Sequence, residues 1–260
     1  MTRLPVSVCL ISGAEAHRIG RALASVSGWA SEVLVVLNEE VNDGTDILCE
    51  EQGAKVFRER WKGYVAQKNS VADKAVGPWI LSLDADEEVP ASLWGEIAKT
   101  LEDPEKNEGY AAFDFPRCSY YFGRWIRYGD WYPDRCIRLW RKGKARWAGR
   151  QVHEKLRVDG CIGRLHHDLL HYTTETINHQ IAKTVKYADY FAEQWLEQAR
   201  PVGFRDLVFR PGWRFVRGYF FRLGFLDGWQ GLTIAWLTAF YTFLRYARAR
   251  EALSQRNTQQ

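Results

Sequence analysis

Apolar and polar positions in the first hundred residues follow two alternating patterns. Short apolar runs, typical of buried strands, occupy residues 6–11, 32–37, 54–57 and 79–83. Between them, and again over 89–101, apolar residues recur at helical spacing. Strands that alternate with short helices predict right-handed βαβ units and a mostly parallel sheet, which binds its ligands at the carboxyl edge.

Aromatic residues dominate the next segment, from residue 110 to 147. Residues 110–115 and 136–140 alternate like strands, and 142–144 form a predicted turn. We expect most of the rings to fill the core, and the alternative is a flat apolar wall for a sugar acceptor. The rings are Tyr110, Phe113, Phe115, Tyr120, Tyr121, Phe122, Trp125, Tyr128, Trp131, Tyr132, Trp140 and Trp147.

The C-terminal part has a helical pattern. Apolar residues recur at helical spacing from Ile177 to Trp195 and form one face of a predicted amphipathic helix, whose other face is charged. From residue 201 onward, Phe, Tyr and Trp are interleaved with Arg, and residues 229–247 contain no Asp, Glu or Lys. The polar residues in 229–247 make this stretch marginal for crossing a bilayer, whereas Arg with aromatic residues suits the membrane interface. We therefore expect residues 201–247 to bind a membrane surface; the alternative is a helical hairpin packed on the globular body.

The charge is distributed unevenly. The net charge of the chain is +4, but residues 200–260 hold ten Arg, no Lys and three acids, a charge of +7 that leaves −3 for residues 1–199. A neutral-to-acidic body with a basic aromatic tail argues against a nucleic-acid partner, whose basic face usually lies on the folded body.

The five cysteines are scattered, and none forms a Cys-x-x-Cys pair. This favours reduced thiols in a cytoplasmic protein over a disulfide framework or a zinc site. A strand that begins near Pro5 is also not expected of a secretory signal.

Two carboxylates directly follow the fourth predicted strand, at Asp84 and Asp86 on either side of Ala85. Hard oxygen ligands at this sheet edge suit Mg²⁺ or Mn²⁺, which are held by one or two carboxylates together with substrate phosphates. The alternatives are solvated loop residues or caps of the helix that begins near Pro90.

Four of the six histidines fall between His153 and His171. His167 and His171 have the spacing of a zinc pair, but no Glu lies between them to act as the general base of a metalloprotease. We therefore set a zinc hydrolase aside and keep His153 and His171 as candidates to complete a metal site or to contact a diphosphate.

Several motifs together resemble glycosyltransferase family 2, and within it the branch that includes the lipopolysaccharide inner-core β-1,4-glucosyltransferases. The resemblance spans about residues 5–247. The motifs are PVSV at 5–8, EVLVV at 32–36, DGT at 43–45, GAKV at 53–56, AQKN at 66–69, WILSLDADE at 79–87, VHEK at 152–155 and GFLDGWQG at 224–231.

The resemblance implies a GT-A fold, a nucleotide-sugar donor, a divalent metal and inversion at the anomeric carbon. It places the diphosphate and the metal at Asp84 and Asp86, with Asp86 the direct ligand. One departure is that Leu37 and Asn38 stand where the family commonly has an Asp after the second strand. The donor-binding residues that it implies are Ser12, Ala14, Glu15, Asn38, Lys68, Asn69, Asp84, Ala85 and Asp86.

We therefore predict a hexosyltransferase that moves a sugar from a UDP-sugar such as UDP-glucose to a lipid-linked saccharide of the cell envelope. The GT-A domain would span residues 1–172, with a nucleotide-binding half at 1–102 and an acceptor half at 103–172, and a helical extension over 173–260 would attach it to the inner face of the cytoplasmic membrane. Glu154 is the predicted general base, with Asp130 and Asp134 in reserve. The alternatives are a non-catalytic membrane-associated binding protein of the same fold, a transferase with another donor or acceptor, and a nucleotidyltransferase.

Overall fold

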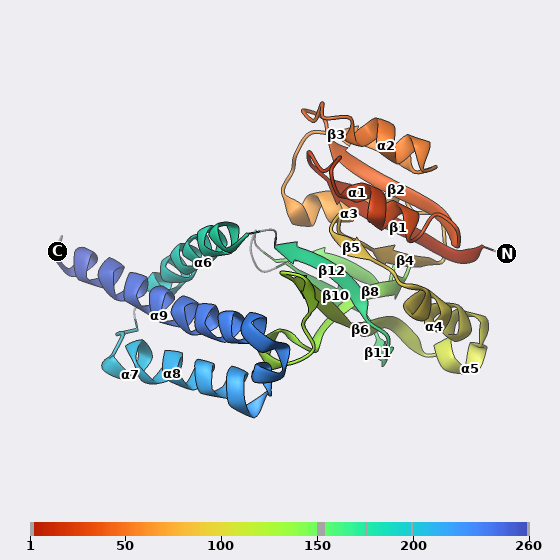
Figure 1. The fold of residues 1–260 in the computed structure, drawn as a ribbon. Coiled ribbons are helices and arrows are strands. Elements are labelled where there is room, and N and C mark those ends of the chain that lie inside the picture. The colour runs from red at the N-terminus through yellow and green to blue at the C-terminus, as the bar shows by residue number, and fades with distance from the viewer. Residues whose placement is uncertain (1–2, 150–153, 175, 199, 259–260) are drawn as a thin grey trace. The chain divides into compact units, whose positions relative to one another are not determined.

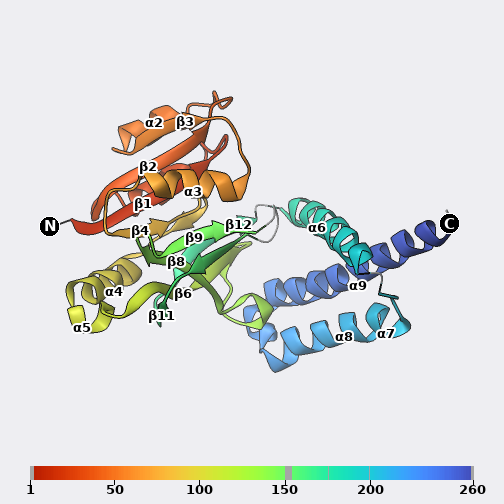
Figure 2. The same ribbon diagram turned by 180° about the vertical axis from the view of Figure 1, so that it is seen from behind.

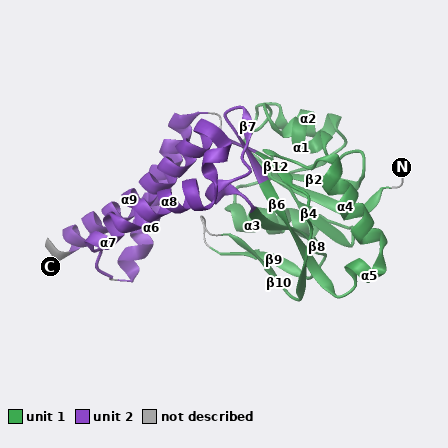
Figure 3. Cartoon of the chain, turned by 60° about the horizontal axis from the view of Figure 1, so that its bottom comes forward, with its two compact units in different colours: residues 1–117, 134–171 green, residues 118–133, 172–260 purple. Residues whose placement is uncertain are grey.

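The computed structural model describes residues 3–149, 154–174, 176–198 and 200–258. The chain forms two compact units (Figure 3). The first unit contains residues 1–117 and 134–171, and the second contains residues 118–133 and 172–260. The predicted helical extension covers residues 173–260, and the second unit contains residues 118–133 in addition.

Parallel strands form the first half of the main sheet (Figure 1). β1 lies between β2 and β4, and β2 also pairs with β3, all in parallel. The elements of this half are β1 (Leu4–Ser12), α1 (Ile19–Ala24), β2 (Ala30–Asn38), α2 (Thr45–Glu51), β3 (Lys55–Glu59), α3 (Tyr64–Lys74), β4 (Trp79–Ser82), β5 (Glu87–Glu88), α4 (Ala91–Glu102) and α5 (Pro104–Asn107).

Both faces of these central strands are buried, which explains their nearly continuous apolar sequence. On β1, Val6, Val8 and Leu10 belong to the core on the face that α1 and α4 cover. Cys9 points to the opposite face, where the core includes Val71 of α3. Helices on both faces leave the ends of the strands as the accessible edges of the sheet.

Antiparallel strands extend the sheet beyond β4. β8 pairs with β4 and with β6, and the whole ten-stranded sheet has the order β3-β2-β1-β4-β8-β6-β12-β5, with β7 and β11 pairing with β6. A separate hairpin is formed by β9 and β10. The bounds are β6 (Tyr110–Tyr121), β7 (Arg124–Trp125), the 3-10 helix η1 (Gly129–Trp131), β8 (Asp134–Arg141), β9 (Ala145–Ala148), β10 (Lys155–Val158), β11 (Cys161–Arg164) and β12 (Leu169–Thr174).

The second unit is mainly helical. Its long helix α9 runs beside α6 and α8 (Figures 1 and 2), and a small core forms around Ala192, Tyr246 and Ala249. None of the helices in the described part of the chain is both long and apolar enough to cross a membrane. The elements are α6 (Ile177–Glu197), α7 (Phe204–Leu207), α8 (Phe209–Val216), the π-helix η2 (Arg217–Phe221), the 3-10 helix η3 (Gly224–Asp227) and α9 (Gly228–Thr258).

A close approach of backbone explains one glycine of the first unit. A Cβ at Gly77, just before β4, would lie 2.7 Å from Ser7 Oγ and 3.1 Å from Ser7 N on the neighbouring strand. We predict that Gly77→Ala lowers the free energy of unfolding by about 1–3 kcal/mol, measured by urea denaturation, because the two strands must separate. Gly28→Ala is the control, since nothing lies within 4 Å of that position. Equal stability of the two variants would contradict this account.

Candidate active site

The predicted donor-binding residues lie at the carboxyl ends of adjacent parallel strands. Ser12 ends β1, Asn38 ends β2, and Asp84 follows β4 after one further residue. Because β1 pairs with both β2 and β4, these three positions share one edge of the sheet. This edge is where open α/β sheets bind ligands.

Hydrogen bonds tie the loop after β1 to the loop after β2. Asp43 accepts hydrogen bonds from the Thr45 hydroxyl at 2.6 Å and from the Ala16 backbone N–H at 3.2 Å. The Glu15 N–H in turn donates to the Thr45 hydroxyl at 3.1 Å. The DGT motif therefore fixes the segment that carries Ala14 and Glu15, and Ala14 itself is exposed.

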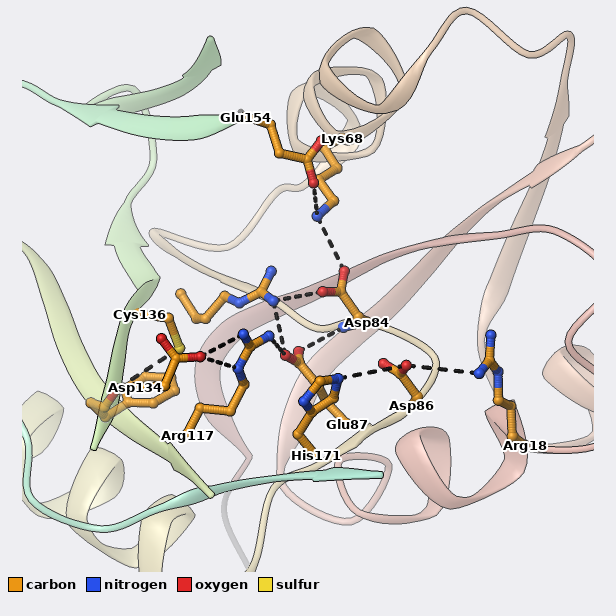
Figure 4. A network of polar contacts seen from close by, with 12 residues as sticks. Arg18, Lys68, Asp84, Asp86, Glu87, Arg117, Asp134, Cys136, Glu154 and His171 are labelled. Atoms are coloured by element: carbon orange, nitrogen blue, oxygen red, sulfur yellow. Dashed lines mark hydrogen bonds and ion pairs between the residues drawn. The ribbon is translucent and has the colours of Figure 1, made fainter. Parts of the chain in front are cut away.

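Asp84 is bound by two cations. Its Oδ1 lies 3.2 Å from Lys68 Nζ (Figure 4). Its Oδ2 lies 2.6 Å from an Arg138 nitrogen. Burial raises the pKa of Asp84, but the charges of Arg138 and Lys68 outweigh it and hold the pKa well below its usual range. Asp84 is therefore ionised at neutral pH, with both oxygens occupied.

The ion pairs continue from Asp84 through Glu87 to Asp134. Arg138 also binds Glu87 Oε1 at 2.8 Å, and the same oxygen lies 3.2 Å from Arg117. Arg117 reaches Asp134 at 2.6 Å. Glu87 also accepts a hydrogen bond from the Asp84 backbone N–H at 3.0 Å, so the network fixes the acidic loop as well as its side chains.

Asp86 faces a histidine. Its Oδ2 lies 3.6 Å from His171 Nε2 and 3.8 Å from Arg18, which also pairs with Glu15. Burial raises the pKa of Asp86, but its interaction with His171 outweighs this effect and the net pKa is lowered. An ionised carboxylate with an imidazole beside it is a donor set that fits a divalent cation.

The described residues contain no group of three or more His, Cys, Asp or Glu side chains that could hold a metal ion alone. Asp86 and His171 supply two donors, so a diphosphate and water would have to complete the sphere, as is usual for Mg²⁺. His153, the other predicted candidate, lies outside the described residues.

Lys68 connects Asp84 to Glu154. Its ammonium lies 3.0 Å from Glu154 Oε1 and 4.6 Å from the centre of the Trp147 ring. The other carboxylate oxygen of Glu154, Oε2, is buried and accepts no hydrogen bond from the residues that the structure describes. A buried carboxylate oxygen without a donor is uncommon and can accept a proton from a ligand.

Asn69 and the reserve bases have other contacts in the structure. The Asn69 side chain exchanges two hydrogen bonds of 3.0 Å with the backbone of Trp147, which fixes β9 against α3. Asp134 is held by Arg117, and Asp130 belongs to the second unit. Of the three candidate bases, Glu154 is the one joined to Asp84 through a shared cation.

The sequence interpretation missed Glu87, Arg117 and Arg138. A signal was present in β8, where Arg138 interrupts an apolar strand and is buried. A buried Arg requires a carboxylate partner, but the sequence does not indicate which one. The pairing of β8 with β4 brings Arg138 next to its partners, Asp84 and Glu87.

We predict that Arg138→Met lowers the free energy of unfolding by about 3–5 kcal/mol, because it leaves the buried Glu87 beside the half-buried Asp84 without their shared cation. Arg141→Met on the same strand is the control. Arg141 donates hydrogen bonds to carbonyl oxygens rather than to a carboxylate, so about 1 kcal/mol should be lost. Urea denaturation measures both variants, and an equal loss would contradict the importance of the network.

Comparison with known proteins identifies the family. The sequence profile of Glycosyl transferase family 2 matches residues 7–167. An uncharacterized glycosyltransferase of Rickettsia typhi is 31% identical over 97% of this chain and 89% of its own length. The lipopolysaccharide core biosynthesis glycosyltransferase LpsC of Rhizobium meliloti is 27% identical over 94% of each chain.

Solved structures share the fold. The Pyrobaculum calidifontis mannosyltransferase PcManGT, in complex with GDP-Man and Mn²⁺, aligns with a TM-score of 0.51 and 13% identity over 98% of this chain and 76% of that chain. S. aureus TarS 1–349, in complex with UDP-GlcNAc, aligns with a TM-score of 0.50 and 13% identity over 98% of this chain and 92% of that chain. The predicted GT-A fold is confirmed, and the chain belongs to glycosyl transferase family 2 and is a glycosyltransferase.

Proposed function

We propose that the enzyme transfers a hexose, with inversion, from a UDP-sugar such as UDP-glucose to a saccharide of a lipid-linked acceptor in lipopolysaccharide core synthesis. Two similarities support this proposal. LpsC, similar over nearly the whole chain, is a lipopolysaccharide core biosynthesis glycosyltransferase, and TarS was solved with UDP-GlcNAc.

The observation that carries the proposal is the position of Glu154. One of its oxygens is held by Lys68, which also binds Asp84, and its other oxygen is buried without a donor among the described residues. Lys68 therefore places a proton acceptor at a fixed distance from the acidic loop. A base oriented in this way is what an inverting transfer to a hydroxyl group requires.

In the reaction, the acceptor hydroxyl oxygen forms a bond to the anomeric carbon on the face opposite the diphosphate. The bond between that carbon and the diphosphate oxygen breaks, and its electron pair leaves with the UDP. Glu154 takes the hydroxyl proton through Oε2, while Lys68 keeps Oε1 in place. Asp86 and His171 would hold the divalent ion, which when bound stabilises the charge on the leaving diphosphate.

We also propose that the second unit attaches the enzyme to the inner face of the cytoplasmic membrane. Large apolar side chains of residues 201–247 are exposed, and Phe221 and Phe204 are each about two-thirds exposed, at 70% and 68%. Exposed aromatic residues beside Arg suit the headgroup region, which would bring the enzyme to a lipid-linked acceptor.

Replacing the base tests the catalytic assignment. We predict that Glu154→Gln lowers turnover by about 10²–10⁴-fold, the contribution of a general base, while UDP binding is retained. The measurement is UDP release from UDP-glucose with Mn²⁺ and a lipopolysaccharide core acceptor. Asp134→Asn is the matched variant, and loss of activity there with normal turnover in Glu154→Gln would move the role of base to Asp134.

Replacing the proposed metal ligand tests donor binding. Wild-type protein should gain about 2.7 kcal/mol of stability at a UDP concentration of 100 times its Kd in Mn²⁺. We expect Asp86→Asn to lose the part of this gain that depends on Mn²⁺, because the carboxylate charge is removed. The measurement is a thermal shift with UDP in Mn²⁺ and in EDTA. Asp73→Asn, on the exposed end of α3, should behave as wild type; an unchanged Mn²⁺ effect in Asp86→Asn would disprove the assignment.

A further inference from the structure

The second unit contains one carboxylate surrounded by three arginines. The Asp130 side chain is only 8% exposed, and its oxygens lie 2.6 Å from Arg217, 3.3 Å from Arg214 and 3.6 Å from Arg222. One negative charge among three positive charges leaves the cluster with an excess of about two positive charges.

The surrounding backbone holds this arginine cluster, Asp130 with Arg214, Arg217 and Arg222, in place. The Gly129 N–H donates to the Arg222 carbonyl oxygen at 2.9 Å. The buried Asp227 carboxylate accepts hydrogen bonds from the backbone N–H groups of Arg127 at 3.0 Å and Tyr128 at 2.8 Å. The segment that leads into Asp130, residues 127–129, is therefore fixed to Arg222 and Asp227 of the same unit.

The arginines keep donors to spare. Each guanidinium has five N–H groups, and a single carboxylate cannot accept from most of fifteen donors. The side chains of Arg214, Arg217 and Arg222 remain 30–47% exposed, while Arg217 Nε is buried without a hydrogen-bond partner in the described part of the chain. Grouped guanidiniums with free donors fit the oxygens of a phosphate group.

Exposed aromatic rings accompany the arginine cluster in α8 and η2. Trp213 precedes Arg214, and Phe220 and Phe221 precede Arg222; the three rings are more than half exposed. A free inorganic phosphate has no apolar group that these rings could contact, whereas a lipid has acyl chains close to its phosphate.

We infer that the arginine cluster is a binding site for the phosphate of an anionic membrane lipid, with the neighbouring rings entering the interface. This inference rests on the proposed membrane attachment and adds a specific headgroup site to it. A second copy of the chain is a poorer occupant, because a two-fold interface over this face would bring two positive clusters together.

The test is vesicle co-sedimentation at fixed ionic strength. The vesicles contain phosphatidylcholine alone, or with phosphatidylglycerol or phosphatidic acid. The double variant Arg214→Gln with Arg222→Gln removes two charges and leaves Arg217 to pair with Asp130. The control, Arg205→Gln with Arg250→Gln, removes two charges from exposed helical positions of the same unit.

We expect wild-type protein to bind the anionic vesicles, and the cluster variant to bind them at least tenfold more weakly than the control variant. The thermal shift of both variants with UDP and Mn²⁺ should be unchanged. Equal weakening in the two variants would mean that vesicle binding depends on net charge alone, and it would overturn the proposed site.

Two further outcomes separate the inference from the proposed attachment. Equally tight binding to all vesicles would leave the attachment standing on the aromatic residues and reject the phosphate site. Failure of the wild-type protein to bind any vesicle would reject both, and a dimer seen by analytical ultracentrifugation would then assign the aromatic face to a second copy.

Discussion

The structure of the site depends on the pairing of buried charges around Asp84. An isolated ionised carboxylate inside a protein is very costly, and the cost is offset only if cations and hydrogen bonds surround it. Lys68 of α3 and Arg138 of β8 both bind the Asp84 carboxylate, and Arg138 also binds Glu87 of β5, so two elements distant from the acidic loop in the sequence supply its cations. Because each charge needs its neighbours, the network also fixes the positions of Asp86 and Glu154.

Asp84 and Asp86 have different roles in this site. Both oxygens of Asp84 are engaged by cations of the chain, so its role in the free enzyme is to hold Lys68 and the acidic loop in place. Asp86 faces His171 instead, and its lowered pKa keeps it charged and able to bind a cation. Two carboxylates one residue apart therefore have different environments, which the Asp-x-Asp spacing alone does not reveal.

Local patterns in the sequence were sufficient to predict most of the fold. The apolar runs at 6–11, 32–37, 54–57 and 79–83 overlap β1, β2, β3 and β4. The runs of β1, β2 and β4 are nearly continuous because these strands are buried on both faces, whereas β3 lies at the edge of the sheet. The same patterns predicted that Ser12, Asn38 and Asp84 lie at the carboxyl ends of parallel strands. The partners of Arg138 and Lys68 could not be predicted from the sequence, since they depend on the antiparallel pairing of β8 with β4 and on the hairpin that carries Trp147. The arginine cluster at Asp130 likewise joins residues more than eighty positions apart.

The account places a divalent ion and a diphosphate at the acidic loop that this network fixes. A crystal structure of the wild-type protein with UDP and Mn²⁺ tests this most directly, through the anomalous signal of the metal. The account predicts a manganese ion about 2.2 Å from an oxygen of Asp86, in contact with the diphosphate, and Asp84 still bound to Lys68 and Arg138. Nucleotide bound elsewhere, or an ion bound away from the Asp86 side chain, would contradict it.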